Sequence, residues 1–349
     1  MRKILLALLF SGFLFGVSAQ EKMVTRTING ASAVKTLLVR ASVNVILDAS
    51  CGEKIEIKVA QTLEQALFTE LKGNVFTVAY KGNVKEQVAV SPKATIRLSA
   101  KNLEYLSARG DGTVTFKTPV SVSRLKVDLE HSMKLSGKFT ASELYLKMGN
   151  TSSANCDVTA KYFDVAMSGV TRLTAKGNVP ELKLHEIANA SASLGNLLGI
   201  QTLDLSLKGN SKANLKASGV AKIYLGGSSQ LTSSLTLSNL TLSTNDSPGM
   251  ALSGNASEAV VSLSGRNTFP GGQFSVAVKA DVKCSGETAA TVKCGGDIAV
   301  KASGKARITV PACGGILKVT AQNEAKILHP KGVKLNVVMV KDQATMQEL

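Results

Sequence analysis

The stretch LDLSLKGN at residues 203–210 contains the pattern that decides the fold. Leu203, Leu205 and Leu207 alternate with polar residues, and this period of two is that of a strand with one buried face. Gly209 and Asn210 follow at once, and both residue types tolerate the positive φ of a sharp corner. The stretch therefore predicts a short strand that ends in a tight turn.

The same pattern recurs about every 19 residues along most of the chain. The clearest units begin at Leu125, Leu144, Phe163, Leu182, Leu203, Ile223 and Leu240, and weaker units begin at Ala259, Val278, Ile298, Leu317 and Leu335. A second short alternating piece follows in each unit, as in residues 213–217, and a small corner such as Gly177 or Gly219 closes it. Such self-similarity is typical of a repeat architecture.

A unit of about 19 residues is too short for a strand–helix–strand unit, which needs about 30. We therefore predict an all-β fold, a right-handed parallel β-helix whose equivalent strands stack about 4.8 Å apart. Five apolar residues would then form one internal ladder: Leu144, Phe163, Leu182, Leu203 and Ile223. An antiparallel sandwich or a blade array remains an alternative, but the units lack the Asn-Gly hairpin turns expected of it.

The chain divides into four predicted segments. Residues 1–19 have a basic start, an apolar run from Ile4 to Val17 and a small-residue exit at Ala19, which predicts a cleaved signal peptide. The alternative is a membrane anchor, but the run is short of the roughly 20 residues that span a bilayer. Residues 20–93 are less regular and predict a β segment capping the solenoid. Coils occupy residues 94–341, and 342–349 form a polar, frayed tail.

Three short motifs near the predicted cap resemble those of a known family. They are Ser42-Val43-Asn44 with the apolar residues that follow it, the strand 95–99, and residues 103–110, which end in Gly110. In this order they resemble the auto-transporter adhesin family with a head GIN domain, found in Bacteroidetes, although Ser42 stands where the family has glycine. The resemblance implies a β-helix, export and a surface or periplasmic role, and it supplies no catalytic residues.

Composition and charge bear on the partners. Aromatic residues make up 4% and Trp is absent, against 44% hydrophobic residues, so the core must be aliphatic. The net charge is +16, and its surplus is concentrated between Val276 and Lys341. The candidate polyanion-binding residues are Lys293, Lys301, Lys305, Arg307 and Lys318. An acidic glycan or lipopolysaccharide would suit them, whereas specific nucleic-acid binding lacks interleaved aromatics. The alternative is a solvated face.

Cys294 and Cys313 lie one coil apart and are expected to stack, either as buried thiols or as a disulfide. Cys284 is a rival partner, and one of the five cysteines must stay unpaired. Cysteine and histidine spacings suit no metal site, and no cofactor motif occurs.

Catalytic groups do not gather at one position of the repeat. Asp128 and Glu130 share a strand face beside Lys126, as a solvated edge would, and His131, His185 and His329 occupy different positions. Enzymatic sites need converging carboxylates or a nucleophile beside a base. We therefore expect no enzyme, but an exported β-helix protein that presents a binding surface in the periplasm, on the outer surface or outside the cell.

Two other functions remain open at this point, a polysaccharide-active enzyme and a purely structural envelope component. We expect no transmembrane segment in the mature chain. The sequence identifies neither the surface ligand nor the oligomeric state.

Overall fold

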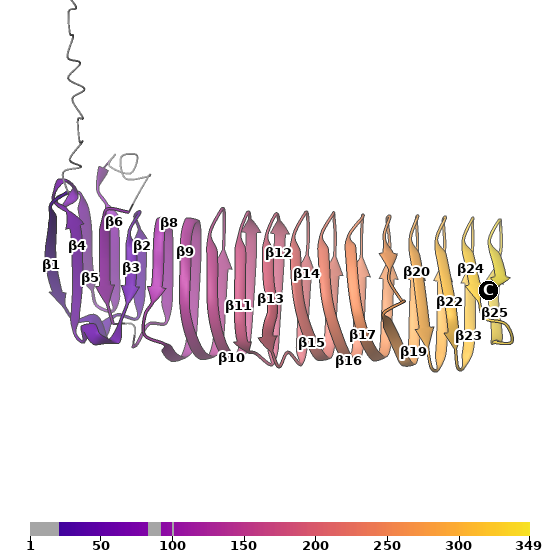
Figure 1. Ribbon diagram of the computed structural model, residues 1–349. Helices are drawn as coiled ribbons and strands as arrows, with labels where there is room; N and C mark the ends of the chain where they lie inside the picture. The colour runs from indigo at the N-terminus through magenta and orange to yellow at the C-terminus, as the bar shows by residue number, and fades with distance from the viewer. Residues whose placement is uncertain (1–20, 83–91, 100) are drawn as a thin grey trace, which may run out of the picture.

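The structure is a computed structural model that describes residues 21–82, 92–99 and 101–349. Over these residues it is a β-solenoid of about 13 turns with a spacing of about 19 residues and without any α-helix. Figure 1 shows the coils in a single row from the N-terminal cap to the C-terminal end. The predicted fold class is confirmed. The predicted signal peptide, residues 1–19, lies outside the described residues.

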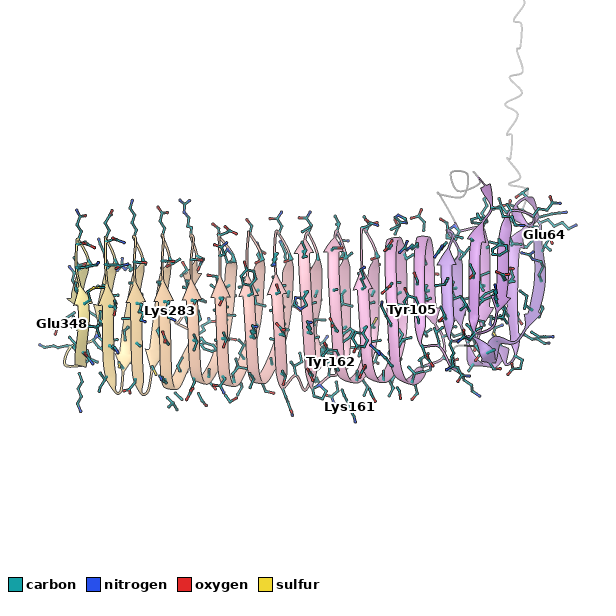
Figure 2. All side chains as sticks on the ribbon, turned by 180° about the vertical axis from the view of Figure 1, so that it is seen from behind. Glu64, Tyr105, Lys161, Tyr162, Lys283 and Glu348 are labelled. Atoms are coloured by element: carbon teal, nitrogen blue, oxygen red, sulfur yellow. The ribbon has the colours of Figure 1, made fainter. Side chains whose placement is uncertain are left out.

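One coil shows how the others are built. Within β10 (Ser153–Gly169), residues 153–160 pair in parallel with residues 134–141 of β9 (Val120–Met148), and residues from 162 onward pair with the stretch beginning at Glu143. The chain bends at Lys161, on the rounded lower side in Figure 2. We call this side the bend edge. Residues 153–160 and their counterparts form the first face, and residues 162–168 and their counterparts form the second face.

The strands pair with their equivalents in the neighbouring coils. The remaining solenoid strands are β8 (Tyr105–Phe116), β11 (Arg172–Asn178), β12 (Glu181–Ala188), β13 (Ser191–Leu198), β14 (Thr202–Leu207), β15 (Lys212–Leu225), β16 (Gln230–Thr244), β17 (Gly249–Leu263), β18 (Thr268–Phe269), β19 (Phe274–Cys284), β20 (Ala289–Cys294), β21 (Asp297–Ala302), β22 (Arg307–Cys313), β23 (Ile316–Ala321), β24 (Lys326–His329), β25 (Lys334–Val340) and β26 (Thr345–Glu348). Of these, β12, β14, β21, β23 and β25 lie on the second face, and β11, β13, β18, β20, β22, β24 and β26 on the first.

The edge opposite the bends, the turn edge, is a column of left-handed residues. From His131 onward every coil places one there: His131, Asn150, Gly169, Ala188, Gly209, Gly227, Asp246, Gly265, Gly286, Gly304, Asn323 and Asp342, with φ between 59° and 91°. The backbone ladder continues through these turns, since Asn189 N–H donates to the Gly169 carbonyl at 3.0 Å and Lys305 N–H to the Gly286 carbonyl at 2.9 Å. The predicted corners therefore pair with one another as the strands do.

The core consists of apolar ladders that run along the solenoid axis. Leu144, Phe163, Leu182 and Leu203 stack in register, as the sequence predicted. The next member is Ala221, whereas Ile223 pairs with Leu205, so the prediction for Ile223 was wrong. A shift of two residues leaves the same side chains facing inward, and the alternation therefore does not reveal where a coil is shortened.

The N-terminal end is closed by antiparallel pairs. The cap contains β1 (Met23–Asn29), β2 (Thr36–Arg40), β3 (Asn44–Leu47), β4 (Lys54–Ala60), β5 (Leu67–Lys72), β6 (Val75–Tyr80), β7 (Ala94–Leu98) and the 3₁₀ turns η1 (Ala31–Ala33), η2 (Ala49–Cys51) and η3 (Gln61–Leu63). β1 pairs antiparallel with β4, and β5 with β6. These antiparallel pairs lie at the N-terminal end of the row of coils.

Both ends of the repeat differ from the predicted boundaries. β7 pairs antiparallel with β4, so it belongs to the cap although it lies after residue 93. At the other end, β26 pairs in parallel with β24. The tail 342–349 therefore adds a further strand to the first face and is not frayed, because its alternating residues continue the register of the coil before it.

Candidate binding face

The family-like motif joins the cap to the first coil. The Ser42 hydroxyl accepts the Asp111 N–H at 3.1 Å, and the Asn44 amide oxygen accepts both the Thr113 N–H at 3.2 Å and the Thr113 hydroxyl at 2.9 Å. Val43 is fully buried. A Cβ at Gly112 would overlap the Val43 carbonyl oxygen, which requires glycine there. The motif therefore has a structural role in the seam between β3 and β8.

Replacement of Asn44 by alanine should lower the free energy of unfolding by about 1–2 kcal/mol, because two donors of Thr113 lose their acceptor. Urea unfolding followed by circular dichroism measures the change. Asn155→Ala, at an exposed position of the first face, is the matched control and should be neutral. Equal midpoints for the two variants would contradict a structural role of the motif.

The predicted polyanion-binding residues do not share one face. Lys301 and Lys318 lie on the second face, on β21 and β23. Lys293 and Arg307 lie on the first face, on β20 and β22. Lys305 lies between the two faces, at the turn edge. The sequence showed the surplus of charge, but the face of each lysine depends on where its strand begins after the bend.

The neighbours of Lys305 also argue against a role of this lysine in binding a polyanion. The backbone ladder of the turn edge places Lys305 between Glu287 and Glu324. Glu287 in turn forms an ion pair with Arg266, with 2.9 Å between Nη2 and Oε2. Charges therefore alternate in sign along this edge, and a polyanion would meet as many carboxylates as cations there.

The structure instead gathers exposed lysines at the C-terminal half of the second face. We call this surface the lysine face; it comprises Lys279, Lys283, Lys301, Lys318 and Lys334. Its acidic residues are fewer, namely Glu258, Asp281 and Asp297. Asp297 is engaged, because one of its oxygens accepts the Ile316 N–H at 2.8 Å. Lys279 stands in register between Glu258 and Asp297, so the positive potential of the face comes mainly from Lys283, Lys301, Lys318 and Lys334.

A hollow of about 490 Å³ lies in the lysine face. Lys283 and Lys301 stand directly opposite each other in it, on neighbouring strands. Within the described part of the chain neither lysine forms an ion pair. The other lining residues are mostly hydroxyl-bearing: Ser243, Thr244, Ser262, Ser264, Ser285, Ser303 and Thr320, with Leu263, Cys284, Ala302 and Gln322. Figure 2 labels Lys283 on this face.

A tyrosine cluster at the other end of the second face was missed by the sequence analysis. Tyr145 and Tyr162 meet edge to face, with 5.7 Å between ring centroids, and the Arg124 guanidinium lies 4.8 Å from the Tyr145 centroid. Tyr105 donates to Asp128 at 2.8 Å and has the Lys126 ammonium over its ring; Figure 2 labels Tyr105 and Tyr162. Since cations of the same protein contact these rings, we interpret the cluster as structural cross-strand pairing.

Cys294 and Cys313 occupy equivalent positions in neighbouring coils. Cys294 and Cys313 are paired in register on β20 and β22, and both are free thiols in the structure. Burial raises the pKa of the Cys294 thiol, and the Gly296 N–H partly offsets this effect. Cys284 lies in another ladder, between Leu263 and Ala302, so it is not a partner for Cys294.

Comparison of the sequence with models of known protein families identifies the family of this chain. The sequence model of the family described as "Putative auto-transporter adhesin, head GIN domain" matches residues 34–223 and 198–312. The chain belongs to this adhesin family. The matches cover the Ser42–Asn44 motif and the residues of the hollow up to Ser303, but not Thr320 and Gln322. No curated protein matches the chain.

Solved structures similar to this chain include proteins from Bacteroides fragilis and from two Parabacteroides species. A "putative adhesin" from Bacteroides fragilis has 14% identity and a TM-score of 0.39, covering 71% of this chain and 98% of its own. A "putative adhesin" from Parabacteroides merdae has 13% identity and a TM-score of 0.34, covering 94% and 96%. A "putative lipid binding protein" from Parabacteroides distasonis has 12% identity and a TM-score of 0.33, with the same coverage.

Acidic and histidine residues of this adhesin-family chain are dispersed. His131 lies at the turn edge, His185 points outward on the second face, and His329 is buried. Across residues 21–82, 92–99 and 101–349, no three His, Cys, Asp or Glu side chains lie close enough together to hold a metal ion. No helix in these ranges is long and apolar enough to cross a membrane.

Proposed function

We propose that this protein is a non-catalytic, exported adhesin whose lysine face binds an anionic polymer of a cell envelope or matrix, such as an acidic glycan or lipopolysaccharide. The observation that carries the proposal is the pairing of Lys283 with Lys301 in register on β19 and β21. Like charges directly opposite each other on neighbouring strands destabilise a sheet. An external anion would remove this cost, and no carboxylate of the described chain does so.

The carboxylates of the second face favour a non-catalytic role. Glu130 forms an ion pair with Arg109, with 3.1 Å between Oε2 and Nε, and Glu143 forms one with Arg124 at 3.4 Å. Glycan hydrolysis needs two carboxylates that face the substrate. These two carboxylates are engaged by cations of the adjacent coil, which supports binding over the polysaccharide-active alternative.

The test is a binding assay of residues 20–349 against immobilised lipopolysaccharide, an acidic glycan and a neutral glycan. The wild type should bind the anionic ligands and release them as salt rises from about 0.05 to about 0.2 M. Combined reversal of Lys279, Lys318 and Lys334 to glutamate should weaken binding at least about tenfold, since these lysines contribute charge to the same face without lining the hollow.

The matched control reverses Lys134, Lys212 and Lys216 on the first face, which carry the same charge and are also exposed. This control should keep most of the binding. Equal losses in both triple variants would show a non-specific charge effect and contradict a lysine face. Absence of binding by the wild type to every anionic ligand would favour a purely structural envelope role.

A further inference from the structure

The hollow in the lysine face has the donors of a specific site and not only a positive charge. One outward column of the second face runs along the solenoid axis through Ser243, Ser262, Lys283, Lys301 and Thr320, each paired in register with the next. Neighbouring members are therefore about 4.8 Å apart. Two ammonium groups at the centre of this column are flanked by hydroxyl groups on both sides.

The hydroxyls of this column are available to a ligand. Ser264 and Ser285, which also line the hollow, donate to the carbonyls of Thr244 and Leu263 at 2.7 Å and 3.4 Å. No such bond to another described residue engages the side chains of Ser243, Ser262 or Thr320. These three hydroxyls can therefore turn toward a bound group, because a hydroxyl rotates to suit its partner.

No acidic residue lines the hollow. Asp281, the nearest carboxylate on β19, lines a separate hollow of about 150 Å³ together with Lys279. Leu263, Cys284 and Ala302 contribute apolar surface to the main hollow. A partly apolar lining lowers the local dielectric constant and so strengthens the attraction of Lys283 and Lys301 for an anion.

We propose that Lys283 and Lys301 grip one tetrahedral oxyanion, a sulfate or phosphate ester group carried on the bound polymer; this inference rests on the proposed function. Ammonium groups act as point charges with donors in several directions, which suits oxygens that diverge from a central atom. No arginine lines the hollow, so the charged donors there are the two ammonium groups alone. The flanking hydroxyls would meet the carrier on either side of the ester.

The experiment compares ligands that differ only in the anion. Sulfated dextran, phosphorylated dextran and carboxymethyl dextran of equal charge density are titrated against residues 20–349, and vesicles containing phosphatidic acid test a lipid source of the same phosphate chemistry. The wild type should bind the tetrahedral esters at least about tenfold more tightly than the carboxylate, a difference of about 1.4 kcal/mol. Tighter binding to the vesicles than to phosphorylated dextran would place the ester on a lipid.

Lys283→Met with Lys301→Met should abolish the preference for tetrahedral esters. The control, Lys279→Met with Lys318→Met, removes the same charge outside the hollow and should weaken all anionic dextrans alike while keeping the preference. Urea midpoints of both variants verify folding. Loss of affinity without loss of preference in the Lys283/Lys301 variant, or no preference in the wild type, would overturn the oxyanion site and leave the proposed function standing. No binding of any anionic dextran would count against the proposed function itself.

Discussion

Replacement of Glu186 by methionine should stabilise the protein at every pH, and by about 4 kcal/mol more at pH 8 than near pH 4. Glu186 is 0% exposed and occupies a core ladder between Met167 and Leu207. Neither carboxylate oxygen has a hydrogen-bond partner among the described residues. Burial raises the pKa of Glu186 from 4.5 to about 8.

The direction in which the free energy of unfolding changes with pH follows from proton linkage. Between the two pKa values the unfolded chain has released the proton of Glu186 while the folded chain keeps it, so the free energy of unfolding falls as pH rises. Each pKa unit corresponds to about 1.4 kcal/mol, so the loss from about pH 4 to about pH 8 is about 4 kcal/mol. Methionine, the residue of the preceding coil, carries no charge and removes this dependence.

Urea unfolding at several pH values measures the effect. Glu186→Gln should also flatten the pH profile, but with a smaller gain because its amide stays buried without partners. Glu181→Met, at an exposed position of the same strand, is the control and should retain the wild-type profile. Parallel pH profiles for wild type and Glu186→Met would show that the carboxyl group is not buried.

Replacement of Gly254 by alanine should cost about 4 kcal/mol and can prevent folding altogether. Gly254 has φ of 110°, where side chains are rarely tolerated, and its added Cβ would overlap the Leu235 carbonyl oxygen. The backbone cannot retreat, because β17 is paired with β16 on one side and β19 on the other. Strain of this kind costs about 1–3 kcal/mol, and disrupted packing and hydrogen bonds add a similar amount.

Thermal and urea unfolding of the purified variant provide the measurement, and yield in the soluble fraction serves where folding fails. Gly249→Ala lies on the same strand, and its Cβ would be 3.7 Å from the Gln230 Cγ, an ordinary contact. This control should be neutral. A Gly254→Ala variant as stable as Gly249→Ala would mean that Gly254 is not held against Leu235 in this register.

The fold was predictable from the sequence because the alternating strand pattern and the turn residues recur together along the repeat. Alternation fixes which side chains face inward, and glycine or asparagine marks the left-handed turn. Register was harder to predict, as Ile223 shows: Leu203 pairs with Ala221 after a shortened coil. Glu186 could have been found from the alternation alone, since it stands where Met167 and Leu207 face inward in the adjacent coils.

The binding face was only partly predictable. Lys301 and Lys318 were identified from the charge surplus, but Lys283 and its neighbouring hydroxyls were not, because their column is defined by pairing between coils. The sequence could not separate Lys293 from Lys301, since the bend between β20 and β21 places them on opposite faces. The position of each lysine relative to the bend, and not the density of charge along the sequence, decides which lysines share a face.

The backbone ladder, which runs through strands and turns with only local register shifts, has a mechanical consequence. Its hydrogen bonds point along the solenoid axis, from one coil to the next. A ligand held on the lysine face and pulled toward the C-terminal end loads all the bonds between two coils at the same moment, and they share the tension. A pull on the last residues of the chain peels the terminal coil one bond at a time. The same rod therefore resists force applied through its side far better than force applied to its end.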